Sequence, residues 1–169
     1  MSEGVALSLA NAELGSPGDL DLWLHGFEQA VEHAGELSLR LPEFLDLRAC
    51  IRELLASVTE GRPLSAEAVE RLNEASSRVP RVARLREGDV IQVPVGTSPA
   101  PLALAHIAWS AIEVLGGPDR VRLRRCRACG RFFVAARADR VWCSDRCGNR
   151  IRVARHHARL RSHTYPVRG

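Results

Sequence analysis

The chain has 169 residues, of which 46% are hydrophobic, enough for one ordinary domain or for a medium domain and a small one. This composition excludes global disorder, and no apolar run approaches the roughly 18 residues that span a bilayer. The first twelve residues also lack the basic start of a secretory signal. We therefore expect a soluble, cytoplasmic protein.

The formal net charge is only +4, but the charge is divided unevenly along the chain. Residues 1–119 contain 9 Arg and 18 Asp or Glu, a net charge of −9. Residues 120–169 contain 15 Arg and 2 Asp, a net charge of +13. An acidic body joined to a strongly basic end favours a terminus that binds a polyanion.

The start of the chain indicates one main helix. A short apolar stretch at residues 7–14 is followed by the turn-forming segment GSPGD. Asp19 is then placed to cap a helix over about residues 20–34, and Gly35 is expected to stop it. The apolar positions of this helix follow the i, i+3, i+4 rule: Leu20, Trp23, Leu24, Phe27 and Val31.

Two further helices and a hairpin are predicted next. One helix follows Pro42 and runs to about Glu60, with Gly61 at its C-cap. The other begins after Ser65, a good N-cap residue, in the segment AEAVERLNEAS. Residues 81–96 have a different pattern from these helical segments, because β-branched residues flank the turn sequence EGD. We expect a β-hairpin of modest length there.

An apolar helix is expected after Pro99 and Pro101, and the glycines at 116–117 close it. The segment GGPDR is the clearest domain boundary. We therefore predict a mainly α fold with a small β-hairpin over residues 1–117, a domain that would sense a signal or form a homodimer. Residues 118–169 are predicted to form a separate C-terminal module.

Four of the five cysteines cluster in the pattern Cys126-x2-Cys129-x13-Cys143-x3-Cys147. In a cytosolic chain, clustered cysteines favour a metal site over disulfides. Zinc prefers four tetrahedral ligands, and thiolates suit its borderline-soft character. We predict one structural Zn²⁺, since four thiolates leave no position for water or substrate. The alternative, four independent buried or redox cysteines, fits the paired spacing less well.

The residues around the cysteines predict a treble-clef-like zinc finger. Gly130 permits the positive φ of a zinc knuckle, and the segment FFVAARADRVW between the pairs has room for two short strands. Ser144 is a good N-cap, so Cys143 is expected just before a helix and Cys147 in its first turn. Lone Cys50, on the apolar face of the second helix, is expected in the core.

The last helix, over residues 145–161, would be basic around most of its circumference. Its narrow inner stripe is expected to dock on the zinc hairpin and consists of Cys147, Ile151, Ala154 and Ala158. Its only acid is Asp145 at the N-terminus, where a negative charge suits the helix dipole. Arginines four residues apart along this helix repel each other. The residues expected to contact nucleic acid are Arg146, Asn149, Arg150, Arg152, Arg155, Arg159 and Arg161.

Duplex DNA is the partner that this charge pattern favours most. The runner-up is a non-enzymatic adaptor whose basic finger binds an acidic protein surface, including one of this chain's own, or RNA. A purely solubilising tail is the third alternative. Single-stranded RNA is less favoured because Phe132, Phe133 and Trp142 lie close enough to the ligands to be core, which leaves few stacking platforms.

No catalytic constellation is found in the sequence. It lacks G-x-S-x-G, P-loop, Rossmann and H-E-x-x-H motifs, and the segment between the cysteine pairs lacks the His that treble-clef nucleases use. Adjacent His156 and His157 point about 100° apart on a helix and cannot readily share one ion. The protein is therefore predicted not to be an enzyme.

The segments CRACGRFF, WCSDRC and CGNR resemble the CGNR-type zinc finger. That finger usually follows a helical domain named ABATE in bacterial stress-induced transcription regulators. The segments LSLANAEL, LRACIRELLASVTEGRPLSAEAVERLNEA and LALAHIAWSAIEVL resemble the ABATE domain. Together they cover most of the chain, and the resemblance implies a transcription regulator whose finger binds DNA.

Overall fold

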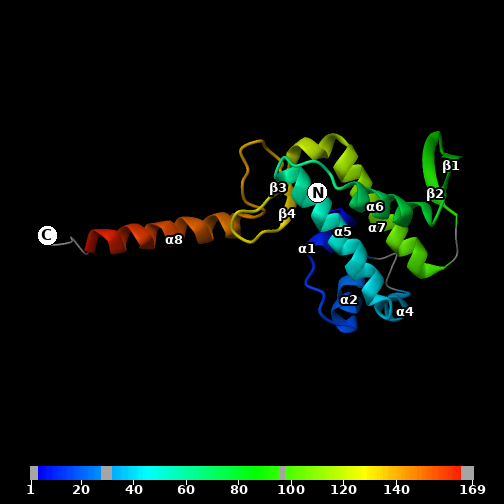
Figure 1. Ribbon diagram of the computed structural model, residues 1–169, viewed down its shortest axis with the longest axis horizontal. Coiled ribbons are helices and arrows are strands. Elements are labelled where there is room, and N and C mark those ends of the chain that lie inside the picture. Colours follow the sequence, from blue (N-terminus) through cyan, green and yellow to red (C-terminus); the bar gives the residue numbers. More distant parts are fainter. Residues whose placement is uncertain (1–3, 28–31, 96–97, 165–169) are drawn as a thin grey trace.

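A helical body makes up one part of the molecule, and a long helix projects from one end of it (Figure 1). The computed structural model describes residues 4–27, 32–95 and 98–164, with side chains up to residue 161. Its elements in chain order are α1 Val5–Asn11, α2 Pro17–Leu24, α4 Ala34–Ser38, α5 Leu41–Thr59, α6 Ala66–Ser77, β1 Arg81–Arg86, β2 Asp89–Pro94, α7 Pro99–Gly116, the 3-10 helix η1 Pro118–Arg122, β3 Leu123–Arg125, β4 Phe132–Val134 and α8 Asp145–Thr164.

The core of the body lies between α5 and α7, on which α1 and α6 pack. Its fully buried residues include Phe44, Ile51, Leu54 and Ala108. By length and mean hydropathy alone, α7 could cross a bilayer, whereas no membrane-spanning segment was predicted from the sequence. Its buried face packs against α1, α5 and α6, as the core helix of a globular domain does.

α5 and α6 begin and end close to their predicted positions. α5 ends at Thr59, and Gly61 follows with a φ of 68°, the left-handed conformation of a helix C-cap glycine. The Ser65 hydroxyl accepts a hydrogen bond from the Ala68 N–H at 3.2 Å and so caps α6. Cys50 on α5 is 2% exposed, and burial raises the pKa of its thiol, so Cys50 is a core residue as expected.

α2 begins earlier than predicted, because Ser16 rather than Asp19 is its N-cap. The Ser16 hydroxyl accepts a hydrogen bond from the Asp19 N–H at 3.2 Å and donates one to Asp19 Oδ2 at 2.9 Å. The Gly15 N–H also donates to Asp19 Oδ2, at 3.0 Å. These hydrogen bonds lower the pKa of Asp19, and the bond from the Ser16 hydroxyl contributes more than the bond from the Gly15 N–H. Asp19 therefore supports the first turn from inside the helix.

The single helix expected over residues 20–34 is wrong at its far end. The chain turns after α2 at Gly26, whose N–H donates to the Trp23 carbonyl at 3.1 Å. Glycine costs about 1 kcal/mol in a helix interior, which favours the turn at this position. α4 then follows and contains Gly35, the residue that was expected to stop the first helix. Val31 lies outside the described residues.

β1 and β2 form the predicted hairpin, with an antiparallel register from Arg81↔Pro94 to Arg86↔Asp89. Glu87 and Gly88 at its turn have φ values of 54° and 94°, the pair of positive φ angles of a type I′ turn. Most of the hairpin is exposed, and it stands at the end of the body away from α8 (Figure 1).

β3 and β4 pack against the helical body, so the base of the finger is not separated from the body by a flexible linker. Leu123 of β3 and Phe132 of β4 are each 2% exposed and belong to the same core as α1 and α5. Arg52 of α5 donates from Nη1 to the Ala10 carbonyl at 2.5 Å, and its guanidinium lies 5.6 Å from the Phe132 ring centroid. The base of the finger is thus held on the body. The division between residues 117 and 118 stays a prediction.

Candidate metal centre and basic helix

The first cysteine pair lies on a tight turn between β3 and β4. The Cys126 N–H donates to the Arg131 carbonyl, and the Gly130 N–H donates to the Cys126 carbonyl, both at 2.8 Å. Gly130 has a φ of 75°, so the predicted positive φ is confirmed. The expectation that two strands lie between the cysteine pairs is wrong, because β3 precedes the first pair. Residues 135–144 form turns and bends instead.

The second cysteine pair lies at the start of α8. The Ser144 hydroxyl accepts a hydrogen bond from the Cys147 N–H at 3.3 Å, which places Cys147 in the first turn as predicted. Arg140 holds the loop before the helix, since its guanidinium donates to the Trp142 carbonyl at 3.0 Å and to the Cys143 carbonyl at 3.2 Å. This role of Arg140 was not predicted from the sequence.

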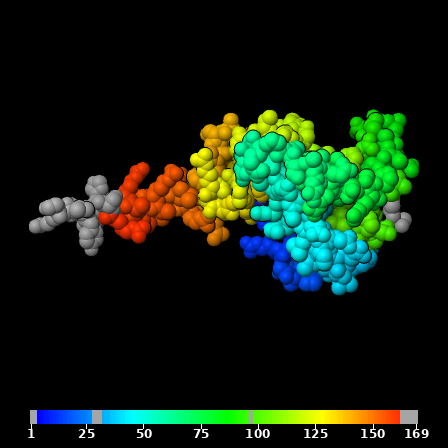
Figure 2. All heavy atoms as spheres, viewed as in Figure 1, coloured from blue at the N-terminus to red at the C-terminus, as the bar shows by residue number. Residues whose placement is uncertain are grey.

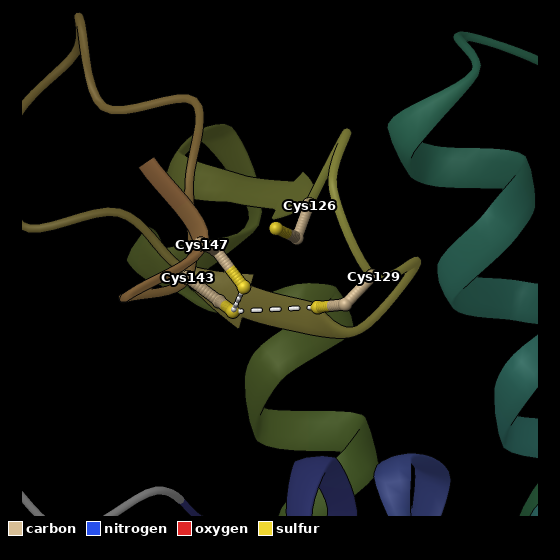
Figure 3. Close-up of side chains that lie close together, drawn as sticks. All are labelled: Cys126, Cys129, Cys143 and Cys147. Atoms are coloured by element: carbon tan, nitrogen blue, oxygen red, sulfur yellow. Dashed lines mark hydrogen bonds between the residues drawn. The ribbon is translucent and has the colours of Figure 1, made fainter. Parts of the chain in front are cut away.

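The four cysteine side chains point toward one another (Figure 3). Their Sγ atoms all lie within 4.8 Å of one another, with 3.5 Å between Cys129 and Cys143 and 3.7 Å between Cys143 and Cys147. A tetrahedral zinc with Zn–S bonds of about 2.3 Å requires S–S separations of about 3.8 Å. The cysteines therefore form a zinc-binding site for one structural ion, with no coordination position left over.

The thiols of this site differ in acidity. Burial raises the pKa of Cys126, but backbone N–H groups of Cys143, Ala128 and Cys129 outweigh it and lower that pKa to about 6. Burial, and then the neighbouring thiols, raise the pKa of Cys143 to about 12, and burial also raises the pKa of Cys129. The four sulfurs cannot all ionise side by side without a cation, and a bound dication removes that restriction.

Gly148 and Arg150 fix the direction in which α8 leaves the finger. Gly148 is buried against the Trp142 indole, and a Cβ on it would lie 3.1 Å from Trp142 Cδ1. The Arg150 guanidinium donates to the Ala128 carbonyl on the knuckle. Arg150 was predicted as a nucleic-acid contact, and in the structure its side chain is engaged with the finger. Its position one turn after Cys147 is the sequence signal for this contact.

The inner stripe of α8 docks less extensively than predicted. Ile151 is half-buried, but Ala154 and Ala158 are exposed. The apolar cluster of the finger consists of Cys126, Phe133 and Ala135 with Ala128, Trp142, Cys143 and Cys147. Phe132 was expected to join it but is turned into the core of the body. The finger therefore offers too little apolar surface to cover more than the first turns of α8, and the rest projects away from the body (Figure 2).

The projecting part of α8 is strongly basic. Asp145 is the only acid of the helix, whose predicted contact residues Arg146, Asn149, Arg150, Arg152, Arg155, Arg159 and Arg161 are all exposed. The Arg152 guanidinium donates to Asn149 Oδ1. Within the part of the chain that the structure describes, Arg146, Arg155 and Arg161 form no ion pair with a carboxylate.

Asn11 is the residue at the base of the finger that sequence reasoning missed. Its Nδ2 donates to the Phe132 carbonyl, and its Oδ1 accepts the Phe132 N–H, both at 2.8 Å. A polar side chain within the apolar segment LSLANAEL was the available signal. Its partner, 121 residues away, could not be identified from that segment.

Two protein families account for the body and the finger. Residues 3–118 match the ABATE family, described as "putative stress-induced transcription regulator". Residues 122–160 match the CGNR zinc finger, which agrees with the geometry of the four cysteines. No curated protein matches the chain. Because the first match alone covers more than half of its residues, the chain belongs to the ABATE family, and a CGNR zinc finger follows its helical body.

Proposed function

We propose that this protein is a transcription regulator that binds duplex DNA through α8. The observation that carries the proposal is the exposed helix that projects from the zinc-held base and whose charged residues, apart from Asp145, are all basic. α8 has 20 residues and is therefore about 30 Å long. The major groove of B-DNA is about 12 Å wide and admits one α-helix.

The arginines of α8 lie on two flanks of the helix, about 180° apart at about 100° per residue. One flank carries Arg152, Arg155 and Arg159, and the other carries Arg146, Arg150 and Arg161. The face between them that points away from the Cys147 stripe carries Asn149, Val153, His156 and Leu160. A helix in the major groove meets a phosphate backbone on either side and base edges at the groove floor. This arrangement suits phosphate contacts by the flanks and base contacts by Asn149 and Val153.

Two observations favour a polyanion over water as the environment of α8. A solvated helix usually mixes both charge signs, whereas Arg155 and Arg159 are like charges four residues apart, which destabilise a helix. Phosphates would turn this repulsion into attraction.

The four thiolates leave no open coordination position, so we also propose that the protein acts by binding rather than by catalysis. Its cytoplasmic location and a homodimer through the body stay predictions.

The test is a titration of the zinc-loaded full chain into fluorescein-labelled duplex DNA, followed by fluorescence anisotropy at several salt concentrations. If Arg146, Arg155, Arg159 and Arg161 contact phosphates, log K falls with log salt at a slope of about −4. Replacing Arg155 and Arg159 by Gln should reduce that slope by about 2. The control replaces Arg84 and Arg86 of the hairpin by Gln, which removes the same charge far from α8 and should leave the slope unchanged.

Absence of salt-sensitive binding to any duplex would contradict the proposal. Binding to single-stranded RNA or to an acidic protein in its place would establish the adaptor alternative, for which the net charge of −9 on residues 1–119 offers an acidic surface on a second copy. Equal loss of affinity in both double variants would mean that total charge, rather than α8, governs the interaction.

A further inference from the structure

The body contains a cavity of about 850 Å³ that lies apart from the zinc finger. α1, α2, α4, α7 and the hairpin contribute its walls. Its apolar lining includes Val5, Trp23, Leu24, Leu37, Leu102 and Ile107. Cavities that bind small molecules typically measure about 300–1,000 Å³ and are mostly apolar with a few polar groups. This cavity fits both criteria.

Arg81 is the polar group that gives the cavity its chemical character. No Asp or Glu is among the lining residues that the structure describes, so the guanidinium has no carboxylate beside it there. It stacks over the Trp109 ring at 4.0 Å from the centroid, and its Nη2 lies 3.4 Å from His106 Nδ1. This stacking fixes the orientation of a cation that would otherwise be mobile.

His106 at the rim is neutral in this arrangement. A guanidinium only donates hydrogen bonds, so His106 Nδ1 must accept from Arg81, and the ring proton lies on Nε2. Partial burial lowers the pKa of His106, and the charge of Arg81 lowers it further. Gln92 adds an amide group to the lining. The described lining therefore combines the fixed positive charge of Arg81, the polar side chains of His33, Gln92 and His106, and apolar walls.

We propose that the cavity binds an apolar organic anion, namely an aromatic or branched aliphatic carboxylate that pairs with Arg81. The planar guanidinium offers two parallel N–H donors that match the two oxygens of a carboxylate. The hydrocarbon part of the ligand packs against Trp23, Leu24 and Leu102. A cation would be repelled by Arg81, and a neutral apolar ligand would leave its charge unpaired. This site does not depend on the proposed binding of DNA.

The test compares 2-naphthoate with 2-naphthamide, which has the same aromatic body without the charge, by isothermal titration of the zinc-loaded full chain. We expect 2-naphthoate to bind at one site per chain and about tenfold more tightly than the amide, as a charged hydrogen-bond pair contributes. Arg81→Gln should remove this preference. The matched control, Arg84→Gln, lies on the same strand outside the cavity and should keep it.

A second variant covers the case in which loss of the Arg81–Trp109 contact disturbs folding. Ala103→Leu leaves Arg81 in place but fills part of the cavity, and it should weaken the binding of both probes about tenfold or more. No saturable binding of 2-naphthoate, equal affinity for the two probes, or unchanged binding in Ala103→Leu would each overturn the proposal. None of these results bears on DNA binding, so the two proposals fail independently.

Discussion

Asn11→Ala removes the side chain that joins α1 to the base of the finger. The Asn11 carboxamide both donates to and accepts from the Phe132 backbone, with two distances of 2.8 Å. Phe132 lies opposite Arg125 in the β3–β4 ladder, and its N–H and C=O point outward from that ladder to Asn11. The carboxamide therefore takes the place of one residue of a neighbouring strand.

The expected destabilisation follows from these two bonds. A hydrogen bond contributes a net of about 1 kcal/mol, and a fully buried group left without a partner costs about 1–3 kcal/mol. Both bonds to Phe132 are partly buried, so water can replace the amide in part. We therefore expect the free energy of unfolding of Asn11→Ala to fall by about 2 kcal/mol.

Urea unfolding followed by circular dichroism, with zinc in excess, measures this change. Asn73→Ala is the control, because Asn73 is exposed on α6, and its free energy of unfolding should change by less than about 0.5 kcal/mol. Hydrogen exchange adds a local readout, since the Phe132 amide loses its acceptor and should exchange faster. If Asn11→Ala matches Asn73→Ala in both measurements, the two bonds do not hold the finger on the body.

Three further predictions concern the zinc site. Cys143→Ser is expected to abolish stoichiometric zinc binding, whereas Cys50→Ala, at a buried cysteine elsewhere, should keep one zinc per chain by elemental analysis. Gly148→Val should weaken zinc binding at least about tenfold in chelator competition, because its Cβ would lie 3.1 Å from Trp142 Cδ1; unchanged affinity would refute that contact. Zinc affinity should also fall as the pH falls, because a Cys143 thiol with a pKa of about 12 must lose its proton to bind. Equal affinities at about pH 6.5 and about pH 7.5 would contradict that proton release.

The sequence predicts those parts of the fold whose signals are local. Ser65 before an apolar period and Gly61 after one mark the ends of two helices, because capping depends on residues within one turn. The extent of the helix over residues 20–34 was predicted from its apolar period, with Asp19 as its cap and Gly35 as its stop, and the turn at Gly26 interrupts it. Periodicity identifies an apolar face, but it does not identify where the chain reverses to place that face on the core.

The zinc ligands were predictable for a similar reason, since short spacings such as Cys126-x2-Cys129 bring their sulfurs together within one turn. The roles of Asn11 and Arg150 depend on backbone groups of Phe132 and Ala128, which only the tertiary structure brings near. The two strands were placed after the first cysteine pair, although they flank it. Short strands carry too few residues for their alternation to fix their position.

The zinc site explains how α8 can remain helical despite its charge. The equilibrium constant for helix nucleation is only about 10⁻³, whereas each further residue adds one hydrogen bond. Cys143, Cys147 and the Ser144 cap fix the first turn, so only the favourable elongation remains. Each pair of like charges such as Arg155 and Arg159 opposes that elongation by about 0.2–0.5 kcal/mol. On a polyanion the same arginines favour the helix, so helix formation and binding reinforce each other. Nucleation of the helix is the contribution of the metal site, because neither the arginines nor the phosphates fix the first turn.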